Sequence, residues 1–192
     1  MPQNSYTEIP KRFLLVRTDR VGDTILTLPA VTALRKKYPE SFISFLAQPY
    51  TIPLIEQYEG IDLLLTYEPE GLHRGWQGVL KLGKQLGNLN FDVEILFFPR
   101  PELAFALWWA NIPLRIGTGF RWYSLLMNKR IYEHRKACLK HESEYNLSLL
   151  DTLLPDQIKQ PKYKFKKWTP ESWWEEFSRE LNCPNAVIPR QT

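Results

Sequence analysis

The chain has 192 residues, and its hydrophobic fraction of 44% and charged fraction of 24% exclude a wholly disordered protein. Its formal net charge of +4 permits attraction to phosphates or to an anionic membrane surface. A dense basic stripe and an RNA-binding aromatic motif are both missing, which argues against a nucleic-acid-binding protein.

The cysteines and the first residues of the chain bear on its location. Cys138 and Cys183 have neither metal-ligand nor disulfide spacing, so we expect no metal site and a reducing compartment. Residues 1–12 are polar and lack the apolar core of a signal peptide, and residues 103–110 are far too few to span a membrane. We therefore expect a cytoplasmic protein. The lysines of residues 159–167 either form a solvated segment or make a peripheral contact with the cytoplasmic face of the inner membrane.

The first predicted elements are a strand, a polar turn and a helix. Phe13–Val16 is continuously apolar, as in parallel strands that are covered on both faces. Residues 17–22 form the turn, and a helix is predicted from about Asp23 to Tyr38, with Pro29 as the site of a kink.

The same alternation continues along the chain. Further strands are predicted at residues 42–46, 62–66, 92–98 and 114–117, with a short one at 129–132, and helices at 52–58, 75–89, 101–111 and 141–154. Strands that alternate with helices predict an α/β fold, a Rossmann-like doubly wound parallel sheet. We expect an aromatic-rich core that includes Trp108 and Trp109; the alternative for these two residues is contact with lipid headgroups.

The character of the sequence changes after residue 154. Residues 155–168 are rich in proline and lysine, which predicts a linker. Thr169 and Pro170 then provide a cap and a first-turn proline for a helix to about Leu181, and residues 186–188 begin a strand. We therefore expect one domain over residues 1–154, followed by a linker, a helix and the start of a second domain over 155–192.

The turn after the first strand, RTDRVGD over residues 17–23, is the most informative segment for chemistry. Ligands of open α/β sheets bind at the carboxyl ends of the strands, where this turn must lie. Gly22 is placed to let the chain turn sharply. The turn matches neither GxGxxG nor a Walker A loop, which argues against NAD or nucleoside triphosphate binding. Asp23 has two compatible interpretations, a helix cap and a general base that deprotonates an attacking hydroxyl.

Several other residues are candidates for contact with an anionic acceptor. Arg17 and Arg20 flank the turn, and arginine suits bidentate anion pairing; the alternative is that both are solvated surface residues. The candidate acceptor contacts are Arg17, Thr18, Arg20, Gly22, Arg100 and Arg121. Arg121 lies between Phe120 and Trp122, an arrangement that either lines an acceptor groove or packs a loop. His141 and Glu142 suit a capping role better than catalysis.

Four segments in order resemble glycosyltransferase family 9, the ADP-heptose:lipopolysaccharide heptosyltransferases. Residues 13–39, FLLVRTDRVGDTILTLPAVTALRKKYP, resemble the opening of that family. Asn90-Phe91-Asp92, Arg115-Ile116-Gly117 and the HESEYNL segment at residues 141–147 are similar to three of its later motifs.

The resemblance implies the amino-terminal, acceptor-side half of a GT-B fold. In that fold, a second domain binds the donor, ADP-heptose or a similar nucleotide-sugar, and transfer inverts the anomeric centre without a metal or cofactor. The family's aspartate base maps onto Asp23. The implied partner is a lipopolysaccharide inner-core acceptor or similar glycan, and a separately encoded donor-binding half is a further candidate partner. We accordingly expect a truncated chain that is inactive alone.

Two alternatives remain open at this stage. One is a Rossmann-like module that binds a glycan or a protein without catalysis. The other is the remnant of a frameshifted gene, since residues 189–192 continue the last predicted strand poorly.

Overall fold

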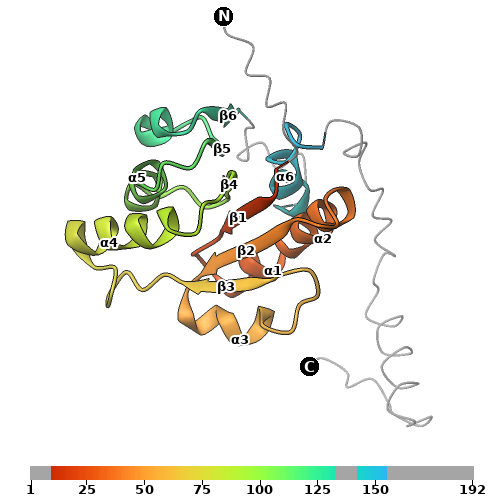
Figure 1. The fold of residues 1–192 in the computed structure, drawn as a ribbon, viewed down its shortest axis with the longest axis horizontal. Coiled ribbons are helices and arrows are strands. Elements are labelled where there is room, and N and C mark those ends of the chain that lie inside the picture. Colours follow the sequence, from red (N-terminus) through yellow and green to blue (C-terminus); the bar gives the residue numbers. More distant parts are fainter. Residues whose placement is uncertain (1–9, 133–141, 155–192) are drawn as a thin grey trace, which may run out of the picture. The chain divides into compact units, whose positions relative to one another are not determined.

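The computed structural model describes residues 10–132 and 142–154, drawn in colour in Figure 1. These residues belong to the first of two compact units, Met1–Lys159. Both cysteines, His141 and the predicted linker, helix and strand over 155–192 lie outside the described residues.

A six-stranded sheet forms the centre of this unit. Its strands are β1 (Arg12–Val16), β2 (Phe42–Ala47), β3 (Leu63–Thr66), β4 (Val93–Leu96), β5 (Leu114–Thr118) and β6 (Lys129–Ile131). They lie in the order β3-β2-β1-β4-β5-β6, and every neighbouring pair is parallel. The strand order reverses direction between β1 and β4, as in doubly wound folds. The predicted Rossmann-like fold is confirmed.

Helices cover both faces of the sheet (Figure 1). The helices are α1 (Val21–Ile25), α2 (Leu28–Lys37), α3 (Ile52–Ile55), α4 (Gly75–Gly87), α5 (Pro101–Trp109) and α6 (Glu142–Ser148), with 3-10 turns η1 (Pro49–Thr51) and η2 (Trp122–Leu126). One buried cluster joins α2, α3 and the α6 segment to the sheet, and a second joins α4, α5 and η2 to its other face. The side chains of β1 alternate between the clusters: Phe13 and Leu15 in the first, Leu14 and Val16 in the second.

The predicted single helix from Asp23 to Tyr38 is two helices. Between them lie Leu26 and Thr27, and Pro29 stands in the first turn of α2. Proline has no N–H to donate to the carbonyl of Ile25, so a regular helical ladder cannot pass through this point. The prediction that Pro29 interrupts the helix is therefore correct, although the interruption is a break and not a kink.

The tryptophans do not contribute to the core as predicted. All four that the structure describes are exposed: Trp76 by 66%, Trp108 by 45%, Trp109 by 52% and Trp122 by 75%. In α5 the buried residues are Leu103, Ala104, Ala106 and Leu107, so the sheet-facing side of this helix is aliphatic. The prediction that Trp108 and Trp109 lie in the core is wrong, because α5 turns them away from the sheet.

Two of the family-like segments hold the sheet together. The Asp92 carboxylate accepts the backbone N–H groups of Lys11 and Arg12 at 2.7 and 2.9 Å, which ties the start of β1 to β4. The Arg115 guanidinium donates to the carbonyl oxygens of Leu126 and Ile112. A Cβ at Gly117 would lie 3.1 Å from Cγ of Met127, so β5 packs closely under η2.

Glu94 is an exception to the apolar interior. It lies on β4 with no exposed surface, and neither carboxyl oxygen has a hydrogen-bond partner within the described residues. Burial raises the pKa of Glu94 well above its ordinary value, and the charge of Arg115, its neighbour on β5, only partly opposes this. Between the ordinary carboxyl pKa and this raised pKa, the folded protein therefore retains a proton that the unfolded chain releases.

This predicts a pH dependence of stability. Since the folded state binds the extra proton, the free energy of unfolding falls as pH rises from the ordinary carboxyl range towards the raised pKa of Glu94. Glu94→Met removes both the proton and the unpaired oxygens. We expect it to stabilise the protein at pH 7 by about 1–3 kcal/mol. Urea unfolding from pH 4 to 8 checks this, and a gain that does not shrink towards pH 4 would contradict it.

Candidate functional site

The candidate site lies at the carboxyl edge of the sheet, beside the point where the strand order reverses. The turn 17–20 follows β1, and Arg100 follows the neighbouring strand β4. Chain segments leaving two such strands diverge in opposite directions, which opens a crevice for ligands at this edge.

Arg17 is the centre of this site, and it is buried. Its side chain is 2% exposed and forms a two-point contact with Asp19, Nε to Oδ1 at 2.5 Å and NH2 to Oδ2 at 2.8 Å. NH2 also lies 3.2 Å from Oδ1 of Asp23, and NH1 lies 3.7 Å from Oε1 of Glu142. One guanidinium thus contacts three carboxylates. Arg17 is therefore not the solvated surface residue of the alternative interpretation, and its charge is used within the protein.

Helix α6 completes the surroundings of Arg17. NH1 of Arg17 donates to Oδ1 of Asn146 at 3.2 Å, and Asn146 has no exposed surface. The amide nitrogen of Asn146 donates to the carbonyl of Leu26 and to the hydroxyl of Thr27, the two residues between α1 and α2. The HESEYNL segment therefore fixes both the turn after β1 and the helix break. The sequence predicted a capping role for Glu142 but not its ion pair with Arg17.

The two aspartates of the turn have different surroundings. The Asp19 side chain is 11% exposed; burial raises its pKa, the hydrogen bond and charge of Arg17 oppose that shift, and the charge of Asp23 adds to it. The Asp23 side chain is 31% exposed and is paired with Arg17 through Oδ1 alone. Asp23 is therefore the carboxylate of this pair that an incoming ligand can reach.

Polar residues after β2 fix the backbone of the same turn. The Gln48 amide donates to the carbonyl of Thr18, and the Tyr50 hydroxyl donates to the carbonyl of Asp19. Thr18 is 1% exposed, and its own hydroxyl has no hydrogen-bond partner in the described part of the chain. Gln48 and Tyr50 were not predicted as site residues. The signal available was their position directly after a strand that neighbours β1.

The local predictions for Gly22 and the helix cap need correction. The N-cap of α1 is Arg20, without a side-chain cap, and Asp23 lies in the first turn as its acidic residue. Gly22 lies within α1 and has no positive φ, so the chain does not need glycine there for a sharp turn. A Cβ at Gly22 would meet nothing within 4 Å, so this position faces open space.

The other predicted acceptor contacts are accessible and stand at the same edge. Arg20 is exposed in the turn after β1, Arg100 is partly exposed after β4, and Arg121 is exposed after β5. The Arg100 guanidinium lies 5.5 Å from the ring centre of Phe98. Phe120 and Trp122, which flank Arg121, are 47% and 75% exposed. Three cationic side chains thus follow three strands of one sheet edge.

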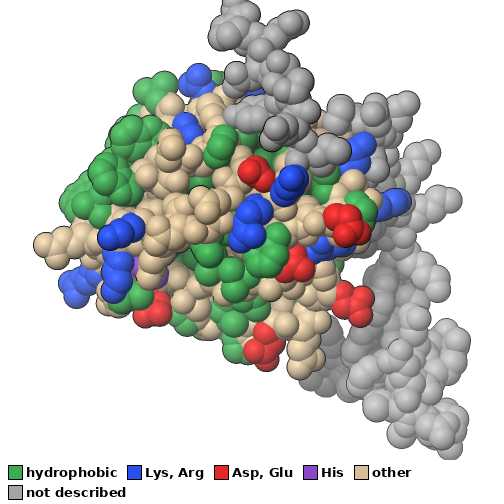
Figure 2. All heavy atoms as spheres, in the orientation of Figure 1, with side chains coloured by type: hydrophobic (Ala, Val, Ile, Leu, Met, Phe, Trp, Pro, Cys, Tyr) green, Lys and Arg blue, Asp and Glu red, His purple; other side chains and the backbone are tan. Residues whose placement is uncertain are grey.

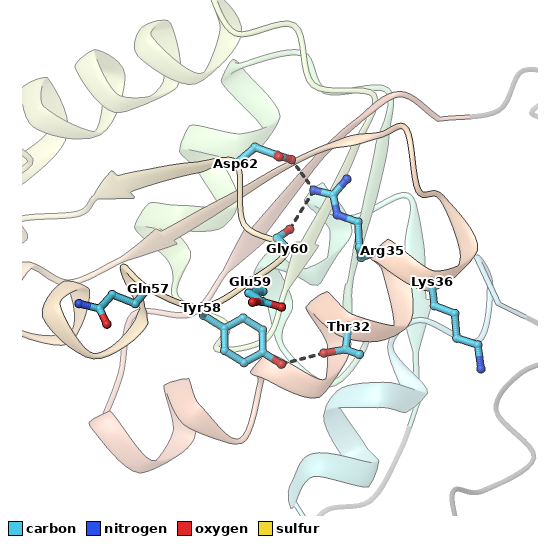
Figure 3. Close-up of a pocket in the computed structure, with 8 residues that line it drawn as sticks. All are labelled: Thr32, Arg35, Lys36, Gln57, Tyr58, Glu59, Gly60 and Asp62. Carbon is cyan, nitrogen blue, oxygen red and sulfur yellow. Dashed lines mark hydrogen bonds and ion pairs between the residues drawn. The ribbon is translucent and has the colours of Figure 1, made fainter.

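A cavity of about 830 Å³ lies elsewhere, at the amino ends of the strands (Figure 3). Several of its polar groups are paired with one another: the Arg35 guanidinium bonds to Asp62 and to the carbonyl of Gly60, and the hydroxyls of Thr32 and Tyr58 are 2.7 Å apart. Because these pairs join α2 to the segment before β3, we assign them a structural role.

Within residues 10–132 and 142–154, no group of three or more His, Cys, Asp or Glu side chains is arranged to hold a metal ion. In the same part of the chain, no helix has the length and apolarity needed to cross a membrane.

No family model matches the sequence, but two curated proteins of Haemophilus influenzae do. The first, to which a glycosyltransferase activity is attributed, is 26% identical over 144 residues, 75% of this chain and 41% of that protein. The second, the lipopolysaccharide core heptosyltransferase OpsX, is 32% identical over 87 residues, 45% of this chain and 24% of that protein. The chain thus spans less than half the length of either relative.

Solved structures show the same relationship in the fold. A glycosyltransferase family 9 structure from Veillonella parvula matches 94% of this chain and 52% of its own, with 20% identity and a TM-score of 0.71. The heptosyltransferase WaaC of E. coli, solved with ADP, matches 73% and 46%, with 17% identity and a TM-score of 0.59. ADP-heptose lps heptosyltransferase II of E. coli matches 72% and 39%, with 20% identity and a TM-score of 0.60.

The chain is thus similar in sequence to two curated proteins described as glycosyltransferases, and its fold is that of the family 9 structures.

The four segments that carry this relationship divide into two groups in space. The Asp92 and Arg115 segments brace the sheet, as described above. The remaining two, residues 13–39 and 141–147, meet at Arg17, which joins Asp19 and Asp23 to Glu142 and Asn146. The resemblance thus includes both the framework of the domain and the candidate site.

The contacts of Arg17 predict a large effect on stability. Arg17→Met leaves the partly buried Asp19 carboxylate without a cation and removes a donor from Asn146. We expect the free energy of unfolding to fall by about 3–5 kcal/mol, as when one partner of a buried ion pair is lost. Arg20→Met in the same turn is the matched control, and because Arg20 is exposed we expect a change within about 0.5 kcal/mol. Urea unfolding at pH 7 compares the two, and equal losses would contradict this account.

Proposed function

We propose that this domain is the acceptor side of a family 9 glycosyltransferase, with Asp23 as the general base. The observation that carries the proposal is the placement of Asp23. It is a partly exposed carboxylate beside the reversal of the strand order, held on one oxygen by the buried Arg17. Such a carboxylate can accept a proton from a bound hydroxyl, and its orientation does not depend on the ligand.

The proposed step is an inverting transfer. The hydroxyl oxygen of the acceptor attacks the anomeric carbon of the donor sugar while its proton passes to Asp23. The bond from that carbon to the nucleotide diphosphate oxygen breaks, and the diphosphate leaves with the electron pair. The proposed donor is ADP-heptose or a similar nucleotide-sugar, and the proposal includes no metal ion or cofactor.

The proposed acceptor is a lipopolysaccharide inner core or a similar anionic glycan. Arg20, Arg100 and Arg121 are the accessible cations that follow β1, β4 and β5, and arginine binds phosphate or carboxylate groups through two parallel hydrogen bonds. Gly22 leaves open space beside Asp23. Arg17 and Thr18 are buried, so we assign them to the support of the turn and not to first contact with the acceptor.

The donor contacts are proposed to come from outside the described domain. The chain spans about half the length of the solved family 9 structure, so the second half of the cleft is supplied by other residues or by a separately encoded chain. Transfer requires that donor and acceptor are held in one geometry, and a single domain provides only one side of it.

The role of Asp23 is tested by transfer of heptose from ADP-heptose to deeply truncated lipopolysaccharide. We expect transfer when the 192-residue chain is mixed with a separately expressed donor-binding half. Asp23→Asn is expected to lower its rate about 10²–10⁴-fold, the usual contribution of a general base, without weakening acceptor binding. Glu56→Gln, which removes an exposed carboxylate directly after α3, is the control and should leave the rate unchanged.

Three outcomes would overturn parts of this proposal. An unchanged rate in Asp23→Asn would exclude it as the base. Transfer by the chain alone would show that no separate donor half is required. Acceptor binding that never leads to transfer in any mixture would favour a glycan-binding module without catalysis.

The acceptor contacts predict a separate effect on affinity. Arg20→Ala, Arg100→Ala and Arg121→Ala each remove one charge-assisted contact, and we expect each to weaken binding of the truncated lipopolysaccharide about tenfold. Isothermal titration calorimetry measures this. The control is Lys37→Ala, which removes an exposed cation at the opposite end of the sheet. An equal loss of affinity in Lys37→Ala would show that the arginines act only through general charge attraction.

A further inference from the structure

An exposed cluster of aromatic side chains covers α4 and α5 on the side away from the sheet. Its members are Trp76 and Leu80 of α4 and Phe105, Trp108 and Trp109 of α5, which we name the aromatic face. Trp76 is 66% exposed, Trp109 52%, Trp108 45% and Leu80 38%. Figure 2 shows hydrophobic side chains gathered over this part of the molecule, at the left of the view.

The aromatic face is a packed unit and not a set of scattered residues. The Phe105 ring lies at its centre, 5.4 Å from Trp76, 5.5 Å from Trp108 and 6.3 Å from Trp109 between ring centres. The helices approach closely beneath it, because a Cβ at Gly83 would lie 2.9 Å from the carbonyl oxygen of Ala106. The rings thus occupy fixed positions on a rigid pair of helices.

Basic residues border the aromatic face on the α4 side. Arg74, Lys81 and Lys84 are all exposed, and α4 contains no acidic residue. The acidic residue of α5 is Glu102 in its first turn. Several cations therefore adjoin a group of tryptophans, with one carboxylate at the end of the neighbouring helix.

We propose that the aromatic face binds the surface of an anionic lipid bilayer. Tryptophan is enriched where a protein meets the headgroup region, because its ring is apolar and its N–H remains hydrated. Lysine and arginine beside such rings are attracted to anionic headgroups. The face lies on the helix layer and the candidate site on the carboxyl edge of the sheet, so contact with a membrane leaves the site uncovered.

A second copy of this chain is a less suitable occupant. A twofold contact between aromatic faces would bring the same patch of both copies together. Where the α4 sides of the two copies meet, Arg74, Lys81 and Lys84 of one copy approach those of the other, and like charges oppose such an association. Anionic lipid, in contrast, complements both the rings and the cations.

Vesicle co-sedimentation of the full 192-residue chain tests this inference. The vesicles are phosphatidylcholine alone or phosphatidylcholine mixed with phosphatidylglycerol. We expect binding to the mixed vesicles only. Trp76→Ser with Trp108→Ser, and separately Lys81→Glu with Lys84→Glu, should each lower the partition coefficient about tenfold or more.

The matched controls lie on the opposite face of the sheet. Lys36→Glu with Lys37→Glu makes the same charge change on α2, and Leu54→Ser removes an apolar side chain of α3 that is 54% exposed. Both should bind as the original chain does. Circular dichroism and urea unfolding establish that each variant is folded before its binding is compared.

Each outcome either supports or overturns the proposed membrane contact. Failure of the original chain to bind the mixed vesicles overturns the proposal, as does binding that the α4 and α5 substitutions leave unchanged. A dimer in sedimentation velocity that the Trp76 and Trp108 substitutions dissociate would assign the face to a second copy. The inference extends the peripheral membrane contact expected of the proposed glycosyltransferase. Because its test uses lipid alone, its failure is distinguishable from failure of the Asp23 proposal.

Discussion

The candidate site depends on one buried cation. Arg17 directly follows β1 and contacts Asp19, Asp23, Glu142 and Asn146, so the turn, the first helix and α6 share a single centre of charge. A buried guanidinium is costly unless its donors are used, and here carboxylate and amide oxygens accept them. The orientation of Asp23 follows from this arrangement, since the same guanidinium that neutralises the partly buried Asp19 also holds one oxygen of Asp23.

The fold places that centre where ligands can reach it. All six strands are parallel, so their carboxyl ends share one edge, and the order reverses between β1 and β4 beside the turn. The break before Pro29 exposes the carbonyl of Leu26, which Asn146 then binds. A continuous helix would have used that carbonyl internally, and α6 would have lost one of its contacts with the turn.

The two faces of the sheet differ in what their helices present to solvent. The α2 and α3 side carries polar pairs such as Arg35 and Asp62, which link neighbouring segments. The α4 and α5 side carries exposed rings beside lysines. Large exposed aromatic groups that lie side by side commonly mark an interaction surface. The proposed catalytic edge and the proposed membrane surface are therefore separate parts of one domain.

The sequence by itself determined the strands, their parallel arrangement and the edge at which Asp23 lies. Buried parallel strands are continuously apolar, and their alternation with helices permits few topologies. Only the tertiary structure decided the partners of Arg17, the burial of Thr18, the unpaired carboxyl of Glu94 and the exposure of Trp108. Asn146 stands 129 residues from Arg17, and no local pattern encodes such a contact. In α5 nearly every residue is apolar, so its periodicity did not indicate which side faces the sheet, and packing against α4 decided it.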